Sequence, residues 1–248
     1  PILGPYIKYP EKQNYRNKLK YEKDTMNSLI KQMPKFIYFN QRFLPSLKNW
    51  LPFYWARFNQ TTKYTYILPL NRETDKIFRQ FKENVKRNIK KAEKTFYIVD
   101  GSEYIDTFYN MLLANRKITY SREFLFNLID TCYKNNSGKL ILAKDKEDKI
   151  SSGVFFVWDN ERTYYLIGAR HPDKKNSQAM SLLIWDAIRQ ASSLSYYFDF
   201  EGSMLEPIER FFRTFGAEQT QDFNVYKYNS IILRSIIGFL GSFNKKYF

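Results

Sequence analysis

The sequence predicts a mixed α/β fold, because strand patterns and helix patterns alternate along the chain. The evidence is clearest in residues 153–217. Residues 154–158 and 163–167 are β-branched and aromatic runs on either side of a short polar turn, which predicts an antiparallel hairpin. Apolar residues then recur every three or four positions from about Ser177, which predicts a helix capped by Asn176 or Ser177.

A second apolar run, residues 196–200, is predicted to form a strand that ends on two carboxylates. Side chains two positions apart on a strand share a face, so Asp199 and Glu201 are expected to lie together at the mouth of the strand. Pro207 suits the first turn of a following helix, and Gly216 suits its end.

Further elements are predicted on the amino-terminal side of this region. Residues 35–40 and 64–70 have strand composition, and residues 139–144 are predicted to be the first strand of a second sheet. Helical spacing predicts two helices, at residues 104–113 and 121–133.

An amphipathic helix with a basic face is predicted between Thr74 and Phe96. Lysine repeats every four residues along it, at Lys82, Lys86, Lys90 and Lys94. Like charges at this spacing destabilise a helix by about 0.2–0.5 kcal/mol per pair. Two interpretations stay open: a solvated face, or a docking surface for an RNA acceptor stem or a nucleotide diphosphate.

Composition limits the classes of function. With 248 residues, 44% of them hydrophobic, the chain can bury the core of one large domain or of two subdomains. The formal charge of +15 attracts nucleic acid, anionic lipid or phosphate-bearing substrates, although abundant lysine can also reflect a coding bias. The charge alone does not choose between these explanations.

Single Cys and His residues argue against several kinds of site. Cys132 cannot form an intramolecular disulfide, and with His171 alone a Cys/His metal site is not expected. We predict a cytoplasmic protein without a signal peptide or a membrane-spanning helix, since no run of about 18 apolar residues is present. The start at Pro1 suggests a processed or truncated chain that lacks the first strands of an amino-terminal subdomain.

Three motifs together carry a family resemblance. They are YLIGAR before the helix near Ser177, FDFEGS followed by IERFFRTFGA, and the basic helix FKENVKRNIKKAEK. The combination resembles the GNAT acyltransferase fold, and within it the FemABX-like transferases that append amino acids to peptidoglycan precursors. The similarity covers roughly residues 50–228.

The resemblance implies a GNAT-like α/β fold with two GNAT-like subdomains, of which the amino-terminal one is incomplete. The expected boundaries are residues 1–73, 74–230 and an amphipathic tail helix at 231–248. The implied activity is transfer of an acyl or aminoacyl group to an amine of a cell-envelope or nucleotide-linked acceptor. The implied co-substrate is aminoacyl-tRNA or acyl-CoA, without a tightly bound cofactor.

The donor would meet the chain where the first hairpin leads into the helix. In acetyl-CoA-dependent GNAT enzymes, backbone N–H groups of a glycine-containing loop meet the pyrophosphate at a helix start. The matching segment here is Lys174, Lys175, Asn176, Ser177, Gln178 and Ala179. Gly168, Ala169 and Arg170 end the strand before it, where the splayed strand would expose backbone groups to the donor carbonyl. An ordinary basic surface turn before a capped helix stays open as the alternative. Ser177 stands where glycine is expected, and its Cβ crowds the approach of a phosphate. This departure favours a Fem-type aminoacyl donor over acyl-CoA.

Candidate catalytic groups are few. Removing a proton from an attacking amine requires a base, and Asp199 and Glu201 are the carboxylates at the predicted strand end. A capping role for these carboxylates at the following helix stays open. Tyr226 on the last predicted strand lies where many GNAT enzymes keep a tyrosine acid.

Other residues are candidates for substrate binding. His171 follows the splayed strand directly, and Arg210 and Arg213 lie off the apolar face of the predicted helix that contains Pro207. Each of them is also compatible with a solvated loop or helix face.

The tail helix offers two further alternatives. It either docks on its own protein or lies on an anionic leaflet, which would place the protein peripherally at the inner membrane face. Two other classes of function also stay open. One is an acetyl-CoA-dependent N-acetyltransferase, and the other is a non-catalytic GNAT-fold module that binds RNA or an anionic membrane surface.

Overall fold

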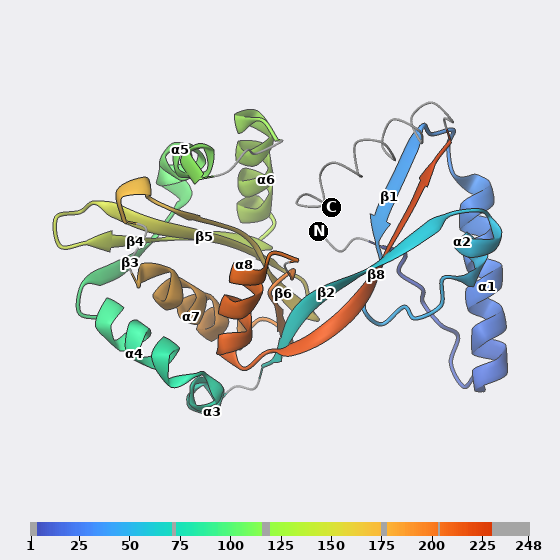
Figure 1. Ribbon diagram of the computed structural model, residues 1–248, viewed down its shortest axis with the longest axis horizontal. Helices are drawn as coiled ribbons and strands as arrows, with labels where there is room; N and C mark the ends of the chain where they lie inside the picture. Colours follow the sequence, from blue (N-terminus) through green and yellow to red (C-terminus); the bar gives the residue numbers. More distant parts are fainter. Residues whose placement is uncertain (1–3, 71–72, 116–119, 175–177, 203, 230–248) are drawn as a thin grey trace. The chain divides into compact units, whose positions relative to one another are not determined.

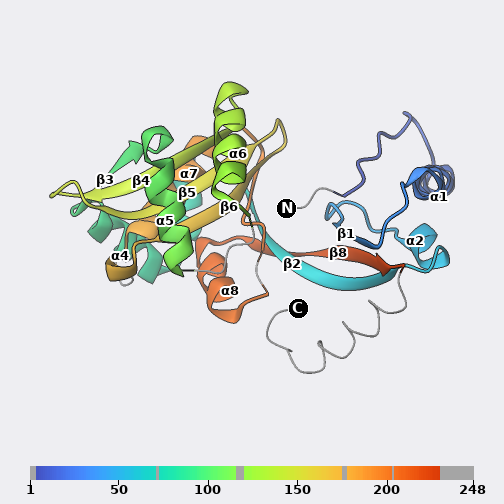
Figure 2. The same ribbon diagram turned by 90° about the horizontal axis from the view of Figure 1, so that it is seen from above.

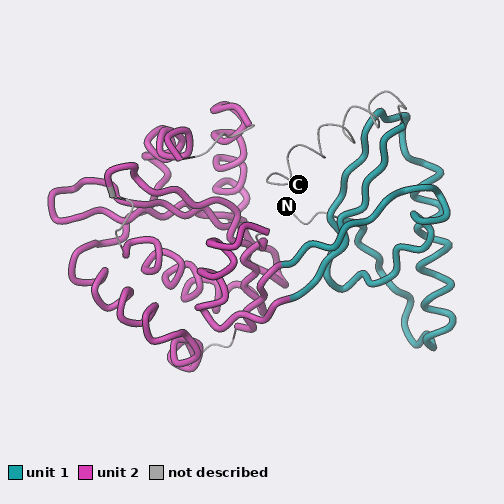
Figure 3. Tube along the Cα trace, in the orientation of Figure 1, with its two compact units in different colours: residues 1–64, 220–248 teal, residues 65–219 magenta. Residues whose placement is uncertain are grey.

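The fold comes from a computed structural model that describes residues 4–70, 73–115, 120–174, 178–202 and 204–229. The chain divides into two compact units (Figure 3). The smaller unit contains residues 1–64 and 220–248, and the larger contains residues 65–219. Strands β2 (Asn59–Pro69) and β8 (Glu218–Tyr228) each carry the chain from one unit into the other.

The smaller unit also contains α1 (Tyr15–Gln32), β1 (Tyr38–Arg42) and α2 (Leu51–Trp55). Strand β1 pairs antiparallel with β8. Beside them lies an apolar core that includes Phe43, Phe53, Phe58 and Val225. Arg42 donates to the buried carboxylate of Asp222 at 2.5 and 2.9 Å, so these two strands are also tied by an ion pair.

The larger unit contains most of the sheet and its covering helices. Its strands are the end of β2, β3 (Phe96–Asp100), β4 (Gly138–Asp145), β5 (Ile150–Trp158), β6 (Arg162–Arg170) and β7 (Tyr197–Asp199). Its helices are α3 (Thr74–Gln80), α4 (Glu83–Ala92), α5 (Ile105–Asn115), α6 (Arg122–Lys134), α7 (Ala179–Ala191) and α8 (Glu206–Phe212), with short 3₁₀ turns η1 (Ser102–Tyr104), η2 (Pro172–Lys174) and η3 (Arg213–Phe215).

The sheet of the larger unit has the strand order β2-β7-β6-β5-β4-β3. All described pairings are antiparallel except that between β6 and β7, which is parallel. Helices α5 and α6 cover one face, while α7 and α4 cover the other (Figures 1 and 2). The predicted mixed α/β fold is therefore confirmed.

Helix α7 is the centre of the larger core. Nearly every one of its side chains is buried, because β5 packs against one side and α4 against the other. Its amino-terminal cap residue is Gln178, which makes no side-chain capping bond. The predicted caps, Asn176 and Ser177, lie outside the described residues.

The structure confirms the hairpin of residues 154–158 and 163–167 as part of β5 and β6. It corrects the long basic helix, which is two helices separated at Phe81 and Lys82. The N–H of Lys82 donates to the carbonyl oxygen of Thr214 at 2.9 Å, so a tertiary contact replaces helical continuity. Phe81 remains buried at the break, which is why the apolar spacing continued through it.

Two other predictions need correction or stay open. The strand at residues 139–144 is present as β4, but it is not the first of its sheet, because β3 precedes it and pairs with it. The predicted domain boundaries at residues 73 and 230 stay predictions, since compact units defined by contacts need not coincide with domains. The predicted tail helix at 231–248 lies outside the described residues.

Among the described residues, we find no helix that is both long and apolar enough to cross a membrane.

A pair of buried hydroxyls tests the packing of the larger unit. The hydroxyl of Ser152 on β5 is buried and has no hydrogen-bond partner among the described residues. Ser152→Ala is expected to raise the free energy of unfolding by about 1 kcal/mol, because an unpaired buried hydroxyl is costly. The matched control is Thr163→Val, expected to lower it by about 1 kcal/mol, because the Thr163 hydroxyl lies 2.8 Å from that of Ser195. Urea unfolding measures the free energy of unfolding of both variants. Equal destabilisation by the two changes would show that the Ser152 hydroxyl does have a partner.

Candidate functional site

The sheet of the larger unit opens between β6 and β7. These two strands pair only from Arg162 to Tyr164, although β6 continues to Arg170 beside β5. Strand β7 is three residues long and pairs on its other side with β2. We call the opening beyond Tyr164 and Asp199 the strand split. A split between neighbouring parallel strands is a place where ligands meet fixed polar groups in α/β folds.

Asp199 lies at the start of the strand split and is completely buried. Its carboxylate accepts from the Thr65 hydroxyl at 2.5 Å and from the backbone N–H of Glu201 at 2.8 Å. The guanidinium of Arg162 lies 3.3 Å away. These partners hold the buried carboxylate in a fixed position.

Glu201 does not lie on the strand, contrary to the expected shared face with Asp199. Strand β7 ends at Asp199, and the backbone of Glu201 is left-handed, with φ of 58°. The cause is local, because the Asp199 side chain accepts from the N–H two residues later and so closes a turn of the Asx type. The turn places Glu201 half-buried beyond the strand end.

Tyr164 is a site residue that the sequence did not indicate. It is the register partner of Asp199 across the parallel pair and is half-buried. Burial raises the pKa of its phenol, and the negative charges of Asp159, Asp199 and Glu201 raise it further. The phenol therefore stays protonated, and its hydroxyl donates to the Asp159 carboxylate at 3.5 Å. Arg162 was missed as well, because nothing in one sequence shows which strands become neighbours.

Aromatic side chains line β6 beyond the point of separation. The Tyr165 ring packs edge-on against Phe212 of α8, with 5.5 Å between ring centres. Its hydroxyl lies across Gly168, where an added Cβ would come within 1.8 Å of that oxygen. Gly168 is thus required by Tyr165.

The remaining residues predicted for the donor are placed as follows. Ala169 is buried on β6, and Arg170 is half-buried with its guanidinium carbon 5.8 Å from the centre of the Phe211 ring. Lys174 ends the turn η2, and its side chain lies outside the described residues together with Lys175, Asn176 and Ser177.

His171 follows Arg170 directly. Its backbone N–H donates to the carbonyl oxygen of Ser151 at 2.8 Å, which fixes the end of β6 against β5. Its Nδ1 accepts from the backbone N–H of Asp173 at 3.3 Å, and the Asp173 carboxylate lies 3.7 Å away. The imidazole is thus oriented by its own loop.

Arg210 and Arg213 both pair with carboxylates of their own helix. Arg210 forms an ion pair with Glu206, and Arg213 lies 3.1 Å from Glu209. Glu209 also accepts from the buried hydroxyl of Tyr66 at 2.6 Å. Binding an anionic substrate at either arginine would compete with these pairs.

Tyr226 belongs to the smaller unit, whereas Asp199 and Glu201 belong to the larger one. On β8 it pairs with Asn40 of β1, and its ring packs edge-on against Tyr228 at 5.9 Å. A catalytic role beside Asp199 stays a prediction.

The basic face of α4 is retained in the folded chain. Its apolar side chains Val85, Ile89 and Ala92 are buried. Lys86 is half-buried and pairs with Glu83 at 2.8 Å. The other cations on and next to the helix are exposed, namely Lys82, Arg87, Lys90, Lys91 and Lys94. Within the described part of the chain, no group of three or more His, Cys, Asp or Glu side chains is arranged to hold a metal ion.

Comparison with known families decides the relationship. The family model of the acetyltransferase (GNAT) domain matches residues 79–213, more than half of the chain. The chain belongs to the GNAT family. A comparison with curated proteins finds no significant match.

Solved structures agree with this assignment at the level of the fold. FemX has a TM-score of 0.67 at 12% identity, with 91% of this chain and 79% of FemX covered. L-PGS from Bacillus licheniformis has a TM-score of 0.57 at 9% identity, covering 91% and 78%. The C-terminal domain (DUF2156) of a putative lysylphosphatidylglycerol synthetase from Agrobacterium fabrum has a TM-score of 0.54 at 8% identity, covering 92% and 78%.

The resemblance to the FemABX-like branch of GNAT proteins is therefore confirmed as a shared fold. The chain is a GNAT-fold acyltransferase.

The buried position of Asp199 leads to a stability prediction. Asp199→Asn is expected to lower the free energy of unfolding by about 3 kcal/mol, because the half-buried Arg162 would lose its buried partner and keep only the exposed Glu161 at 3.6 Å. Asp173→Asn removes the same charge from an exposed side chain and is expected to change stability by less than about 0.5 kcal/mol. Denaturant titration of both variants measures the difference, and similar midpoints would show that the Asp199 pair contributes nothing.

Proposed function

We propose that this protein transfers an acyl or aminoacyl group to an amine of a cell-envelope or nucleotide-linked acceptor. The observation that carries the proposal is the strand split, with Asp199, Glu201 and Tyr164 gathered at its start. The family supplies the reaction class, and these three residues supply a fixed carboxylate, a second carboxylate and a protonated phenol.

The proposed reaction makes one bond and breaks one bond. The acceptor nitrogen attacks the donor carbonyl carbon, so a C–N bond forms while the C–O bond of an aminoacyl ester, or the C–S bond of a thioester, breaks. The attacking amine must lose a proton, and the leaving oxygen or sulfur must gain one. In this proposal Glu201 accepts the amine proton and Tyr164 protonates the leaving group.

Asp199 acts in this scheme as a positioning residue. Its carboxylate is already engaged by Thr65, by Arg162 and by the N–H of Glu201, so it has little capacity to accept a substrate proton. By holding the left-handed turn, it fixes the backbone from which the Glu201 side chain extends. Arg170, at the far end of β6, is proposed to bind an anionic group of the substrate.

Aminoacyl-tRNA is the donor that we favour. The exposed cations on and next to α4, such as Lys90, Lys91 and Lys94, suit a phosphate backbone. Ser177 stands where an acyl-CoA loop has glycine. The fold is also that of a putative lysylphosphatidylglycerol synthetase, whose name describes attachment of an amino acid. The acceptor would be a nucleotide- or lipid-linked precursor, met in the cytoplasm or at the inner membrane face.

Acetyl-CoA is the second candidate donor, because the matching family model is that of an acetyltransferase domain. The positive end of α7 would then face the pyrophosphate, as helix starts do in anion sites.

Replacement of the two proposed proton-transfer groups tests the chemistry. Glu201→Gln is expected to lower kcat by about 100-fold or more, and Tyr164→Phe by about 10-fold, because each loses one proton-transfer group. Glu147→Gln, an exposed carboxylate in the turn between β4 and β5, is the matched control with unchanged kcat. The assay follows transfer of a labelled amino acid from aminoacyl-tRNA to an amine acceptor. Full activity of Glu201→Gln would overturn the assignment of the base.

The donor is tested separately by calorimetric titration with acetyl-CoA and with uncharged tRNA. For an aminoacyl-tRNA donor, tRNA is expected to bind, with binding weakened at least 10-fold by the double change Lys90→Gln and Lys94→Gln. Acetyl-CoA is expected to give no heat. Micromolar acetyl-CoA binding that Lys174→Ala weakens would instead establish the second candidate. Binding of tRNA without transfer in any assay would indicate a non-catalytic module.

A further inference from the structure

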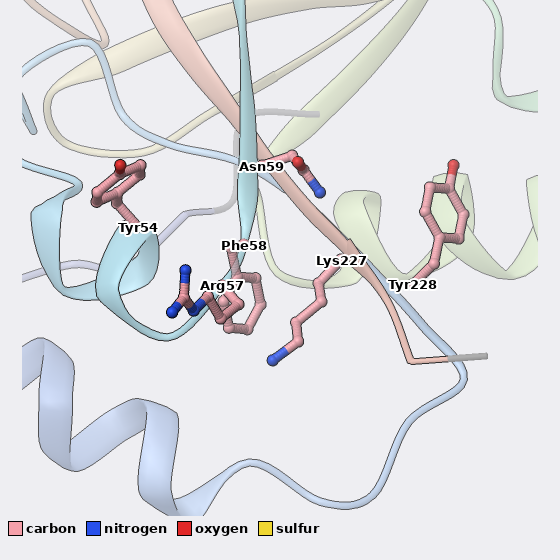
Figure 4. A pocket seen from close by; sticks show the side chains of 6 residues that line it. All are labelled: Tyr54, Arg57, Phe58, Asn59, Lys227 and Tyr228. Carbon is pink, nitrogen blue, oxygen red and sulfur yellow. The ribbon is translucent and has the colours of Figure 1, made fainter. Parts of the chain in front are cut away.

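The smaller unit contains a hollow of about 300 Å³ that the proposed chemistry does not use. It is lined by Tyr54, Arg57, Phe58, Asn59, Lys227 and Tyr228 (Figure 4). These residues come from the end of α2, from the turn into β2 and from the end of β8. Two of the six are cations and none is a carboxylate, so the hollow is suited to an anion.

Arg57 is held in the hollow by a strained turn. Its backbone is left-handed, with φ of 64°, a conformation that costs an L-residue about 1–2 kcal/mol. The turn is closed by hydrogen bonds of 2.9 Å from the N–H of Arg57 to Tyr54 and from the N–H of Phe58 to Phe53. Among the described residues, the Arg57 guanidinium has no hydrogen bond or ion pair. The exposed guanidinium therefore keeps its donors available for an anion.

Lys227 reaches the same hollow from β8. Its ammonium donates to the carbonyl oxygen of Ala56 at 2.8 Å and lies 4.9 Å from the centre of the Phe58 ring. An ammonium has three donor hydrogens, so this anchoring leaves capacity for a bound anion. Figure 4 shows Arg57 and Lys227 on either side of Phe58. A phosphate between them would meet a forked donor and a point charge.

An apolar face lies beside the hollow on α2. Leu51, Tyr54 and Trp55 are spaced at i, i+3 and i+4, so they share one face of the helix. They are 45%, 58% and 55% exposed, whereas Pro52 and Phe53 on the other side are buried. Trp and Tyr next to an aliphatic residue are the side chains that settle at the boundary between lipid headgroups and hydrocarbon.

The charge of the chain is concentrated in this unit. Residues 1–64 and 220–248 carry 16 Lys and Arg against four Asp and Glu, a formal +12 of the total +15. The larger unit carries 24 against 21, so it is nearly balanced. The net positive charge of this unit, together with the exposed Leu, Tyr and Trp of α2, is complementary to an anionic bilayer surface.

We propose that the hollow binds the phosphate of an anionic phospholipid headgroup, while the apolar face of α2 enters the headgroup layer of the same bilayer. Lipid accounts for both halves of the surface, because RNA would leave Leu51 without a function. The site is separate from the strand split and does not depend on the transfer chemistry.

The test is co-sedimentation of the full chain with vesicles of phosphatidylcholine alone and of an equimolar mixture with phosphatidylglycerol. Binding is expected to the mixed vesicles only. The double variant Arg57→Gln and Lys227→Gln is expected to bind about 100-fold or more weakly, because it loses both the diffuse attraction of two cations and their direct bonds to the phosphate. Leu51→Ser with Trp55→Ser is expected to weaken binding at low and high salt alike.

A charge-matched control separates a site from diffuse attraction. Lys20→Gln with Lys31→Gln removes two exposed cations from α1 of the same unit. Its loss is expected to be clearly smaller than that of the Arg57 and Lys227 variant. Thermal unfolding of each variant checks that it is folded. Asn59→Asp is an independent probe, because it puts a negative charge into the hollow with little change of shape. Its vesicle binding is expected to weaken as much as that of the Arg57 and Lys227 variant.

Three outcomes would overturn the proposal. If the double variant at Arg57 and Lys227 and the control at Lys20 and Lys31 lost vesicle binding equally, the attraction would be diffuse and the hollow would not be a site. Calorimetric binding of inorganic phosphate that depends on Arg57 and Lys227, without vesicle binding, would assign the hollow to a soluble phosphate. Binding of a short RNA with that dependence, again without vesicle binding, would assign it to nucleic acid.

Discussion

The larger unit depends on one buried carboxylate. Asp199 on β7 joins Thr65 on β2 and Arg162 on β6, so a single side chain bonds to both neighbouring strands at the point where pairing stops. A buried charge needs such partners, because it has lost its solvation by water. Removing one partner of a buried ion pair destabilises a protein by about 3–5 kcal/mol. The same carboxylate closes the turn that carries Glu201.

Separation of β6 from β7 follows from what packs beyond this point. Phe200 leaves the strand and packs at a tilt against Phe212, with ring centres 4.9 Å apart, while Tyr165 meets Phe212 from β6. Aromatic side chains of β6 and α8 therefore pack together where β6 and β7 no longer pair. The carboxylate cluster sits at the edge of this aromatic packing, which lowers the local dielectric and keeps the Tyr164 phenol protonated.

The sequence predicted those features that depend on neighbours along the chain. The hairpin of β5 and β6, the position of α7 and the place of Asp199 at the end of β7 follow from local periodicity. The shared face expected for Glu201 was wrong, because the Asp199 side chain closes a turn there. It could not predict partners far apart in the chain. Thr65 lies 134 residues from Asp199, and Arg162 is set beside it by the parallel pairing. The break of the basic helix at Lys82 depends likewise on Thr214.

The two units differ strongly in net charge. The larger unit is nearly neutral, and several of its cations pair with carboxylates of the same unit, such as Arg213 with Glu209 and Arg162 with Asp199. The smaller unit has four carboxylates for 16 cations, so most of its cations cannot be neutralised within it. Charges without internal counter-ions act on external anions, and this is a reason to seek the chemistry in one unit and the attachment to an anionic surface in the other.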